Sequence, residues 1–435
     1  MRRTIGNCIL SMVIVMCGGS VVFGSGLESN GIGARSRSMG FAMVGMADDW
    51  SLIYYNPAGA AMIDGRVFGG EYEFFTGGMS STASLRNLPP GVGDPWRNDF
   101  TDPTGGLEPS SFNEKDIGSD IHFGALGYVS GGKRFGWGIG FYGSGSGTAW
   151  EDSVRVGPDT IDAEIAYTNG SANIPVVLAW RVKPELALGV TLGLHWGLLT
   201  TENTKQRSGV GFPYIMDATQ DTQGVSLGID LGLMWKARED LSIGAVVKLP
   251  YTFRKKGDTE IYQSLLPPFP LVAKTDTTVD MQYPLRIALG LAWDVTDRDL
   301  LGFGVTWLNW DRYKMSIDYE NEVAGVLEDW SGNPTRWEDT IRLHGGYERA
   351  LNDKWDLRCG LVYDQAPEPE AYRTLTGGQV IDVWLFTAGA GVDLGDTSID
   401  FGYIFTYGPS VKGYIPGAEY SMELHEFFVG VSKRF

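Results

Sequence analysis

The chain has 435 residues and a formal net charge of −18, an acidity that argues against nucleic-acid binding, which needs a basic face. Glycine is about twice as frequent as usual, with 60 residues, and aromatic residues make up 12% of the chain. Both residue types weaken helices, so the composition favours many strands, tight turns and aromatic girdles.

Residues 1–24 are typical of a secretory signal peptide that is later cleaved. Two arginines near the start precede an apolar run from Ile9 to Met16, and small residues follow around Gly24. This run is too short to span a membrane comfortably, and no later apolar run reaches the roughly 18 residues that a spanning helix needs. Cleavage leaves Cys359 as the sole cysteine, which excludes an intramolecular disulfide or a cysteine-based metal site.

Residues 25–64 form a segment of small residues with strong turn signals. Asp48 and Asp49 are adjacent, and we expect them to cap a helical turn or to pair with cations. A turn-promoting run follows at Asn56, Pro57, Ala58 and Gly59. Asparagine can bond its own backbone and proline fixes φ, so this run predicts a compact unit. The alternative is a simple loop into the first strand.

From residue 65 onward, apolar residues alternate with glycine, alanine and threonine. Clear examples are LALGVTLGLHWGLL (186–199), VSLGIDLGLMW (225–235) and LRIALGLAWDV (285–295). A period of two predicts strands with one apolar face. The opposite face has few charges, as expected for the crowded interior of a barrel and unlike the charged surface of a soluble sandwich.

Short and long connections alternate along this region. Six short polar links predict tight turns, at 130–134, 182–185, 237–240, 295–299, 351–354 and 394–397. Longer variable segments lie near 81–118, 146–171, 202–223, 256–279, 320–337, 366–380 and 409–421. This pattern predicts an all-β transmembrane protein, an antiparallel barrel of about 14 strands over 65–435 in the bacterial outer membrane, with both termini periplasmic.

The last strand ends in an aromatic residue. Phe427, Val429 and Val431 alternate before the terminal Phe435. Such an ending is similar to the signal read by the outer-membrane barrel assembly machinery, which we therefore expect as a partner during biogenesis.

The stretch GIGARSRSMGFAMVGMADDWSLIYYNPAGAAM (31–62) resembles the N-terminal hatch of the FadL/TodX family. These proteins are outer-membrane channels for long-chain fatty acids and other hydrophobic molecules. The stretches PLRIALGLAWDVTDRDLLGFGVTWLNWDRY (284–313) and LHGGYERALNDKWDLRCGLVYDQAPEPE (343–370) are also similar to the family. The chain departs at Phe41, where a second glycine often follows Met-Gly. The resemblance implies that 25–64 plug the barrel lumen, which would otherwise leak, and that the acid pair and the Asn-Pro-Ala-Gly run belong to the gate.

The family has an apolar groove between two extracellular loops, and two predicted loops match it by order and composition. The candidate capture residues are Phe212, Tyr214, Ile215 and Met216 in one loop and Leu265, Leu266, Phe269 and Leu271 in the other. Exposed apolar clusters of this kind usually mark a binding surface. Alternatively, these residues pack the two loops against each other.

Charges on the predicted lumen faces include Lys248, Arg286 and Arg358. A cation there could pair with a fatty carboxylate, or it could belong to a salt-bridge network that holds the plug. In the resembling proteins, cargo leaves sideways through a gap in the wall opened by a kinked strand and by hatch movement. The glycine-rich strand 134–145 could host such a kink.

No motif for catalysis or cofactor binding survives inspection. The GxGxxG spelling from Gly138 to Gly143 lies within a strand, the four histidines are scattered, and no nucleophile elbow occurs. We therefore predict no enzyme, no metal and no cofactor. The predicted function is passive transport of hydrophobic molecules, namely fatty acids or hydrocarbons. They are captured by the loops, held in a lumenal pocket gated by the hatch, and released laterally by a monomer amid outer-membrane lipids. The alternative is a general diffusion porin for small polar solutes.

Overall fold

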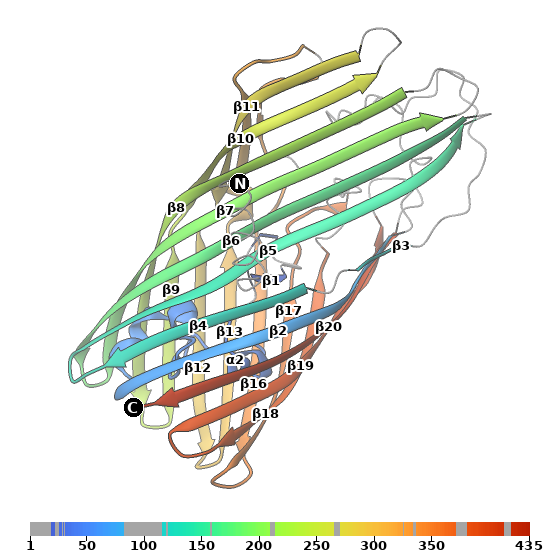
Figure 1. The fold of residues 1–435 in the computed structure, drawn as a ribbon. Coiled ribbons are helices and arrows are strands. Elements are labelled where there is room, and N and C mark those ends of the chain that lie inside the picture. Colours follow the sequence, from blue (N-terminus) through green and yellow to red (C-terminus); the bar gives the residue numbers. More distant parts are fainter. Residues whose placement is uncertain are drawn as a thin grey trace, which may run out of the picture.

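The structure is a computed structural model that describes residues 19–21, 26–27, 29, 31–81, 115–118, 121–156, 159–208, 214–264, 270–324, 326–333, 336–370, 381–412 and 419–435. Strands dominate these residues (Figure 1), and most of them form one continuous sheet. The strands of the first half are β1 (Gly19–Val21), β2 (Gly65–Ser81), β3 (Lys115–Gly118), β4 (Ile121–Gly131), β5 (Phe135–Val156), β6 (Asp159–Lys183), β7 (Leu186–Ser208), β8 (Tyr214–Arg238), β9 (Leu241–Lys248) and β10 (Tyr251–Ser264). Those of the second half are β11 (Pro270–Tyr283), β12 (Arg286–Thr296), β13 (Asp299–Leu308), β14 (Lys314–Tyr319), β15 (Trp330–Gly332), β16 (Thr340–Ala350), β17 (Trp355–Asp364), β18 (Val383–Asp393), β19 (Thr397–Lys412) and β20 (Glu419–Arg434).

The sheet closes into a barrel because β2 pairs with β4 on one edge and with β20 on the other. Five wall strands are interrupted and carry two labels each: β3 with β4, β9 with β10, β11 with β12, β13 with β14, and β15 with β16. Counting each such pair as one strand and leaving out β1, the wall is a closed antiparallel barrel of 14 strands. The predicted fold class is thus confirmed.

The two ends of the barrel differ in their connections. The six predicted short turns all lie between consecutive strands at one end, together with Phe435, and we call this the turn end (Figure 1). The opposite end, where the long hairpins project, is the loop end. The prediction of long loops near 146–171, 202–223 and 256–279 was wrong, because most of these residues extend β5 to β8, β10 and β11.

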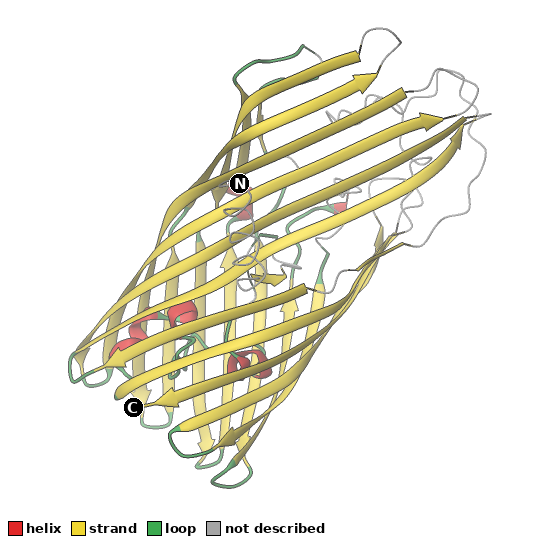
Figure 2. Ribbon diagram, viewed as in Figure 1, coloured by secondary structure: helices red, strands yellow, loops and turns green. Residues whose placement is uncertain are grey.

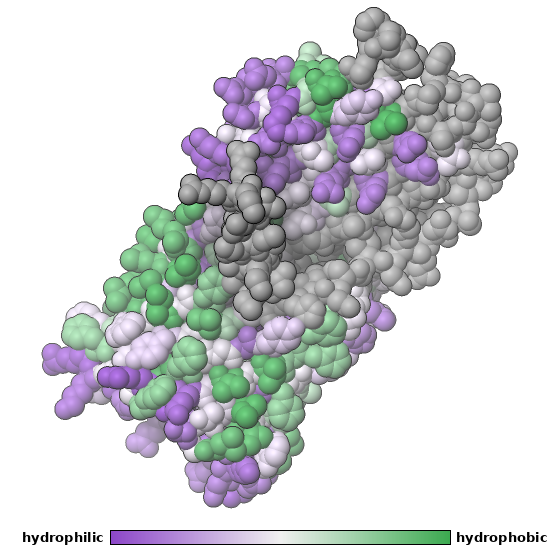
Figure 3. Space-filling model, viewed as in Figure 1, coloured by the Kyte–Doolittle hydropathy of each residue, from purple (hydrophilic) through white to green (hydrophobic). Residues whose placement is uncertain are grey.

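The extended strands escaped sequence analysis because they project beyond the apolar belt. On β8 a run of exposed apolar side chains extends from Val225 to Trp235, and Ile215 is one more near the loop end. The outward residues of β10, in contrast, form ion pairs such as Arg254–Asp280 at 2.6 Å. Figure 3 shows the apolar band between the hydrophilic turns and the hydrophilic upper strands. Where both faces of a strand are polar, the hydropathy alternation that identifies a strand is lost.

Short helices lie inside the barrel in the half nearer the turn end (Figure 2). They are α2 (Ala34–Ser38), α3 (Leu52–Tyr55) and the 3-10 helix η1 (Pro57–Ala61); a further 3-10 helix, η3 (Trp310–Arg312), belongs to the wall. In the part of the chain that the structure describes, no helix has the length and apolarity needed to cross a membrane. We call residues 31–64 the hatch, since they fill the lumen as a plug.

Glycines of the wall admit the hatch at close range. A methyl group on Gly136 would lie 1.9 Å from the Ala60 carbonyl oxygen, and one on Gly244 would lie 1.9 Å from that of Val44. The glycine-rich faces of the strands therefore accommodate the hatch backbone. Side chains of the hatch and the wall form one buried core, so the hatch packs as closely as a protein interior.

Candidate functional site

A buried arginine ties the hatch to the seam that closes the barrel. Arg37 of α2 contacts Glu71 at 3.2 Å and Glu426 at 2.6 Å, and its guanidinium also pairs with Glu73. The Arg37 side chain is 1% exposed. Since Glu71 and Glu73 belong to β2 and Glu426 to β20, the ion cluster joins α2 to both strands of the seam. A buried charge cluster of this kind is strongly destabilised when one partner is lost.

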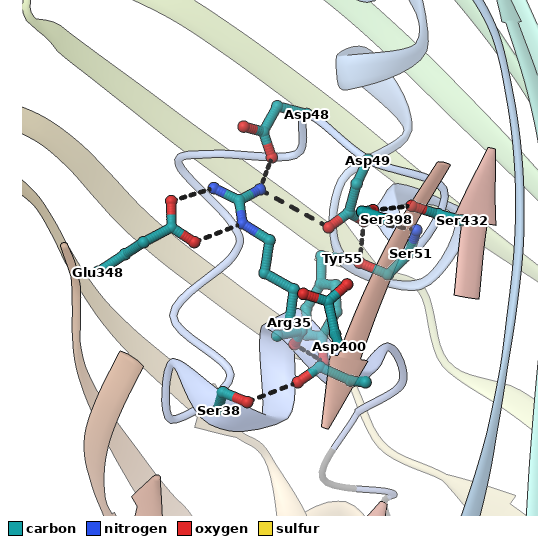
Figure 4. Close-up of polar contacts among 12 residues, drawn as sticks. Arg35, Ser38, Asp48, Asp49, Ser51, Tyr55, Glu348, Ser398, Asp400 and Ser432 are labelled. Atoms are coloured by element: carbon teal, nitrogen blue, oxygen red, sulfur yellow. Dashed lines mark hydrogen bonds and ion pairs between the residues drawn. The ribbon is translucent and has the colours of Figure 1, made fainter. Parts of the chain in front are cut away.

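A second network faces the turn end, around Arg35 (Figure 4). Its guanidinium lies 2.6 Å from Asp48 and makes two hydrogen bonds to Glu348, at 2.8 and 2.9 Å. Arg358 contacts the same Glu348 and lies 2.6 Å from Asp400. The network lines a cavity of about 470 Å³. Arg358, a candidate for a cargo carboxylate, is thus surrounded by carboxylates of the wall.

Asp49 lies beside this network and shapes the chain before α3. Its side chain is 3.7 Å from Arg35 and accepts hydrogen bonds from the backbone N–H and the hydroxyl of Ser51, at 2.8 and 2.5 Å. Asp48, by contrast, has a half-exposed side chain. Asp48 and Asp49 therefore both lie near Arg35, a cation of the hatch itself, and Asp49 also stabilises the local turn at Ser51.

Asn56 locks the turn-promoting run in place. Its amide nitrogen donates to the carbonyl oxygens of Val44 at 3.0 Å and Leu233 at 2.9 Å, and its oxygen accepts from the Ala58 N–H at 3.1 Å. Pro57 opens η1, where its missing N–H leaves no donor unpaired. All four residues of the run are buried, so the run packs against the wall as well as turning the chain.

Towards the loop end, the lumen contains an aromatic cluster. Its buried members are Leu199, Phe253, Val279, Met281, Tyr283, Leu308, Trp310 and Tyr313. Beside it, the ring of Tyr251 stacks between His195 and Tyr283, with 4.9 Å between centroids on each side. Leu27 packs against the cluster and lines two cavities of about 20 and 10 Å³. The two cavities are small and lined mainly by polar side chains such as Ser144 and Ser171, whereas the cluster itself is the apolar surface that suits a hydrophobic ligand.

Lys248 and Arg286 lie where the hatch meets this upper lumen. The Lys248 amine lies 5.8 Å and the Arg286 guanidinium 5.4 Å from the centre of the Tyr54 ring. Arg286 also donates to the Tyr54 hydroxyl at 3.3 Å. Both cations thus contact a hatch residue that faces the aromatic side of the lumen.

Lys255 is a lumenal cation that sequence analysis missed. It is 1% exposed, and its amine donates to the Asn169 side-chain oxygen at 2.6 Å and to the Leu198 carbonyl at 3.2 Å. It makes no ion pair with a described acid. β10 lies beyond the apolar belt, and there burial lowers the pKa of Lys255 to about 7. The alternation of Phe253 and Lys255 against exposed neighbours was the signal that could have found it.

The wall has an incomplete ladder between β4 and β5. Their pairing stops at Ala125 opposite Tyr142, although β4 continues to Ile121 and β5 to Val156. On its other side β5 loses pairing with β6 at Gly140 and Phe141, opposite Ile174 and Pro175, since proline has no N–H to donate. Beyond the gap, β1 pairs in parallel with residues 143–145 of β5.

The predicted capture residues are only partly described. Phe212, Leu265, Leu266 and Phe269 lie outside the described residues, as does the side chain of Tyr214. Ile215 is exposed, Leu271 is half-buried, and Met216 is buried in a cluster with Ile261 and Leu327. Ile215 pairs with Ser264 across β8 and β10, so the two capture segments leave the sheet at neighbouring points.

Sequence analysis also missed Arg35, Arg37, Glu71, Glu73, Glu348 and Glu426. The two glutamates of β2, spaced two apart in a lumen-facing pattern, were the available signal. No cluster of three or more potential metal ligands occurs within the described residues.

Comparisons with known proteins agree with this architecture. A family model described as "Outer membrane protein transport protein (OMPP1/FadL/TodX)" matches residues 15–414. Similar solved structures include a Pseudomonas aeruginosa FadL homologue, at 17% identity over 96% of this chain and 100% of that chain, with a TM-score of 0.67. The Pseudomonas putida toluene transporter TodX matches at 17% identity over 96% and 100% of the chains, with a TM-score of 0.66. The Ralstonia pickettii toluene transporter TbuX matches at 16% over 93% and 99%, with a TM-score of 0.63. A search of curated protein sequences found no significant match.

Proposed function

Because the chain belongs to the OMPP1/FadL/TodX family of outer membrane transport proteins, we propose that it passively carries long-chain fatty acids or hydrocarbons across the outer membrane. The observation that carries this proposal is the division of the lumen into a packed hatch and an aromatic cluster. A diffusion porin needs an open aqueous lumen, and the buried core shared by hatch and wall does not favour that alternative.

On this proposal, residues 1–24 are the cleaved leader, 25–64 the gating hatch and 65–435 the barrel. The turn end, with Phe435, faces the periplasm, and the loop end faces outward. Gly26, near the start of the cleaved chain, lies instead in the lumen beside Trp310 and Trp337, so on this proposal the predicted periplasmic placement of both termini applies to the C-terminus alone. The charged outer faces of the extended strands support this orientation, since they suit the polar zone outside the hydrocarbon region.

Cargo would enter at the tips of the β7–β8 and β10–β11 hairpins, where both capture segments leave the sheet. It would then lie against the aromatic cluster, and a carboxylate would pair with Lys255, Lys248 or Arg286. We assign Arg358 to the network that holds the hatch, because three acids already contact it.

Release would be lateral, through the gap between β4 and β5. Two features support this route: the ladder ends at Tyr142, and the lumen-facing Tyr142 lines a cavity next to Leu27. Movement of the hatch would open the path, and transport would follow the concentration gradient. The protein would act as a monomer without catalysis, contact lipid through its apolar belt and present Phe435 to the assembly machinery.

A disulfide across the gap tests function and route together. In a Cys359→Ser background, Gly124→Cys/Gly143→Cys places cysteines at the next pair in the β4–β5 register. Cells lacking their own transporter would be given labelled fatty acid or toluene. We expect uptake with the reduced protein, its loss on oxidation and its return with reductant.

The matched control is Tyr128→Cys/Ile139→Cys, a pair already within the ladder, whose oxidation should leave uptake unchanged. Uptake that survives oxidation of the gap pair would refute lateral release but not transport. Entry of small sugars without uptake of either hydrophobic probe would favour the porin.

A further inference from the structure

Three buried hydrogen-bond donors lie in two adjoining segments of the loop-end wall. They are the indole nitrogens of Trp310 and Trp337 and the hydroxyl of Thr340, and none has a hydrogen-bond partner among the described residues. Trp310 is 0% and Thr340 is 1% exposed. Buried donors are nearly always paired, so a cluster of unpaired ones is a candidate for binding an acceptor.

The two segments are held together by specific contacts. Leu308 pairs with Thr340 across β13 and β16. The Asp339 carboxylate accepts from the Asn309 side chain at 3.0 Å and from the Asp311 N–H at 3.1 Å. The rings of Trp310 and Trp337 meet edge to face, with 4.8 Å between centroids. The three donors therefore belong to one place in the wall.

This place opens onto the aromatic cluster. Trp310 is a member of the cluster, and Trp337 stacks on Tyr313 with 5.0 Å between centroids. Gly26 packs closely against both indole rings. A methyl group on Gly26 would lie 2.8 Å from Trp337 Cζ3 and 3.2 Å from Trp310 Cζ2. The two indole rings thus lie where the segment that precedes the hatch meets the wall.

The surrounding charges favour an uncharged acceptor. The neighbouring cation, Arg342, donates to Asp364 at 3.0 Å, and both side chains are almost fully buried. The Nε of Arg342 has no partner among the described residues, but Asp364 already balances the charge of this arginine. A carboxylate at the donors would therefore add an unbalanced negative charge to a buried site, which is unfavourable. A hydrocarbon would leave all three donors unpaired. A neutral oxygen avoids both costs.

We propose that Trp310, Trp337 and Thr340 form a binding site for the uncharged oxygen of a neutral hydrophobic molecule, such as the carbonyl of a ketone or an ester. The inference rests on the proposed transport function and specifies a class of cargo for it. Lys255 borders the same cluster through Phe253 and Met281, but its amine donates to Asn169 and Leu198. A neutral carbonyl compound and a carboxylate would thus use different donors of the same lumen.

The experiment uses the mature protein in lipid nanodiscs and three ligands of equal chain length: an alkane, its methyl ketone and its carboxylate. Competition against a bound fluorescent hydrophobe gives relative affinities. We expect the ketone to bind about tenfold more tightly than the alkane. Trp337→Phe/Thr340→Val should remove this preference while leaving alkane affinity unchanged. Thr340→Val alone, which keeps the shape of the side chain, should reduce it in part.

A second readout is the infrared carbonyl stretch of isotope-labelled ketone, which should lie at lower frequency in the wild type than in the double variant. Trp384→Phe removes a lipid-facing indole instead and should change neither measurement. Equal binding of ketone and alkane to the wild type would overturn the site while leaving transport intact. The site would also be overturned if Trp337→Phe/Thr340→Val lost carboxylate binding but kept the preference for the ketone over the alkane. Failure of all three ligands to bind would count against the proposed function itself.

Discussion

The two halves of the lumen use their polar groups in opposite ways. Near the turn end, the guanidinium groups of Arg35, Arg37 and Arg358 each contact three carboxylates. Near the loop end, Lys255 contacts neutral oxygens, and the donors of Trp310 and Trp337 contact none that is described. A network whose charges are all paired holds two surfaces together, whereas unpaired donors beside an apolar wall can bind a ligand. On the proposed function, the paired network would seal the lower lumen and the unpaired donors would bind cargo in the upper lumen.

The largest expected effect follows from removing the cation of the seal. Arg37→Met leaves Glu71, Glu73 and Glu426 buried without their partner, which should cost about 3–5 kcal/mol. Because the cluster joins α2 to the seam, the hatch should detach and the lumen should conduct ions. Single-channel conductance in planar bilayers measures the leak.

Two further variants serve as a negative control and as a weaker form of Arg37→Met. Arg134→Met, at an exposed turn residue, should not conduct. Glu426→Gln removes one acid of the cluster and should conduct less than Arg37→Met. An Arg37→Met barrel that folds and stays closed would show that the ion cluster does not hold the hatch.

A smaller loss should follow from filling the space that admits the hatch backbone. A methyl group on Gly189 would lie 2.4 Å from Ala58 N and from the Pro57 carbonyl carbon, so Gly189→Ala should destabilise the hatch by about 1–3 kcal/mol. Hydrogen exchange of residues 56–61 should accelerate. Gly170→Ala is the matched control, since a methyl group there meets only Leu198 at ordinary distance. Equal exchange in both variants would contradict the close contact.

Asn56→Ala tests the same region through hydrogen bonding. It leaves the carbonyls of Val44 and Leu233 and the N–H of Ala58 without this partner, at a cost of about 1–3 kcal/mol. Limited proteolysis from the turn-end side should cleave the hatch faster, while the heat stability of the barrel should change little. Asn56→Asp keeps the acceptor for Ala58 and loses both donors, so unchanged cleavage in this variant would show that the two carbonyl contacts are dispensable.

The smallest effect is expected in the upper lumen and depends on pH. The pKa of Lys255 is lowered from 10.5 to about 7 in the folded protein. Between these values the unfolded chain binds a proton that the folded chain does not, so stability should rise with pH across this window. Lys255→Met should flatten that rise. Unfolding temperatures of the wild type and of Lys255→Met, measured by heat-modifiability gels between pH 7 and pH 10, would show the difference in slope. Parallel curves for the two proteins would show that the Lys255 amine does not cause the rise in stability with pH.

The features found by sequence analysis are local ones. Period-two alternation marked the strands inside the apolar belt, and turn chemistry marked the six short connections. The alternation failed for the outer parts of β7 and β8, which consist mainly of polar residues and therefore resemble loops. In the outer part of β6, Ile161, Ala163 and Ile165 do alternate with acidic residues, but the segment was still predicted to be a loop. The capture residues remain a prediction, since only Met216, Ile215 and Leu271 have described side chains.

Contacts between distant residues were not predictable in the same way. Arg37 and Glu426 are 389 residues apart and meet only because the barrel closes. From the sequence, Arg358 could equally bind a cargo carboxylate or belong to a structural ion network. Its contacts with Glu348 and Asp400 favour the structural role. Phe41, which departs from the family pattern, keeps the left-handed backbone of a glycine, with φ of 60°, and its ring lies against Arg37.

The barrel, its strand number and its short turns were predictable from the chain alone, because each depends on the periodicity or turn propensity of neighbouring residues. The position of the hatch was predicted from the resemblance of residues 31–62 to a known family. The tertiary structure decided which charges are paired, where the β4–β5 ladder stops and which donors face the aromatic cluster. These depend on strand register and on closure of the sheet. Both bring together residues whose separation along the chain carries no local signal.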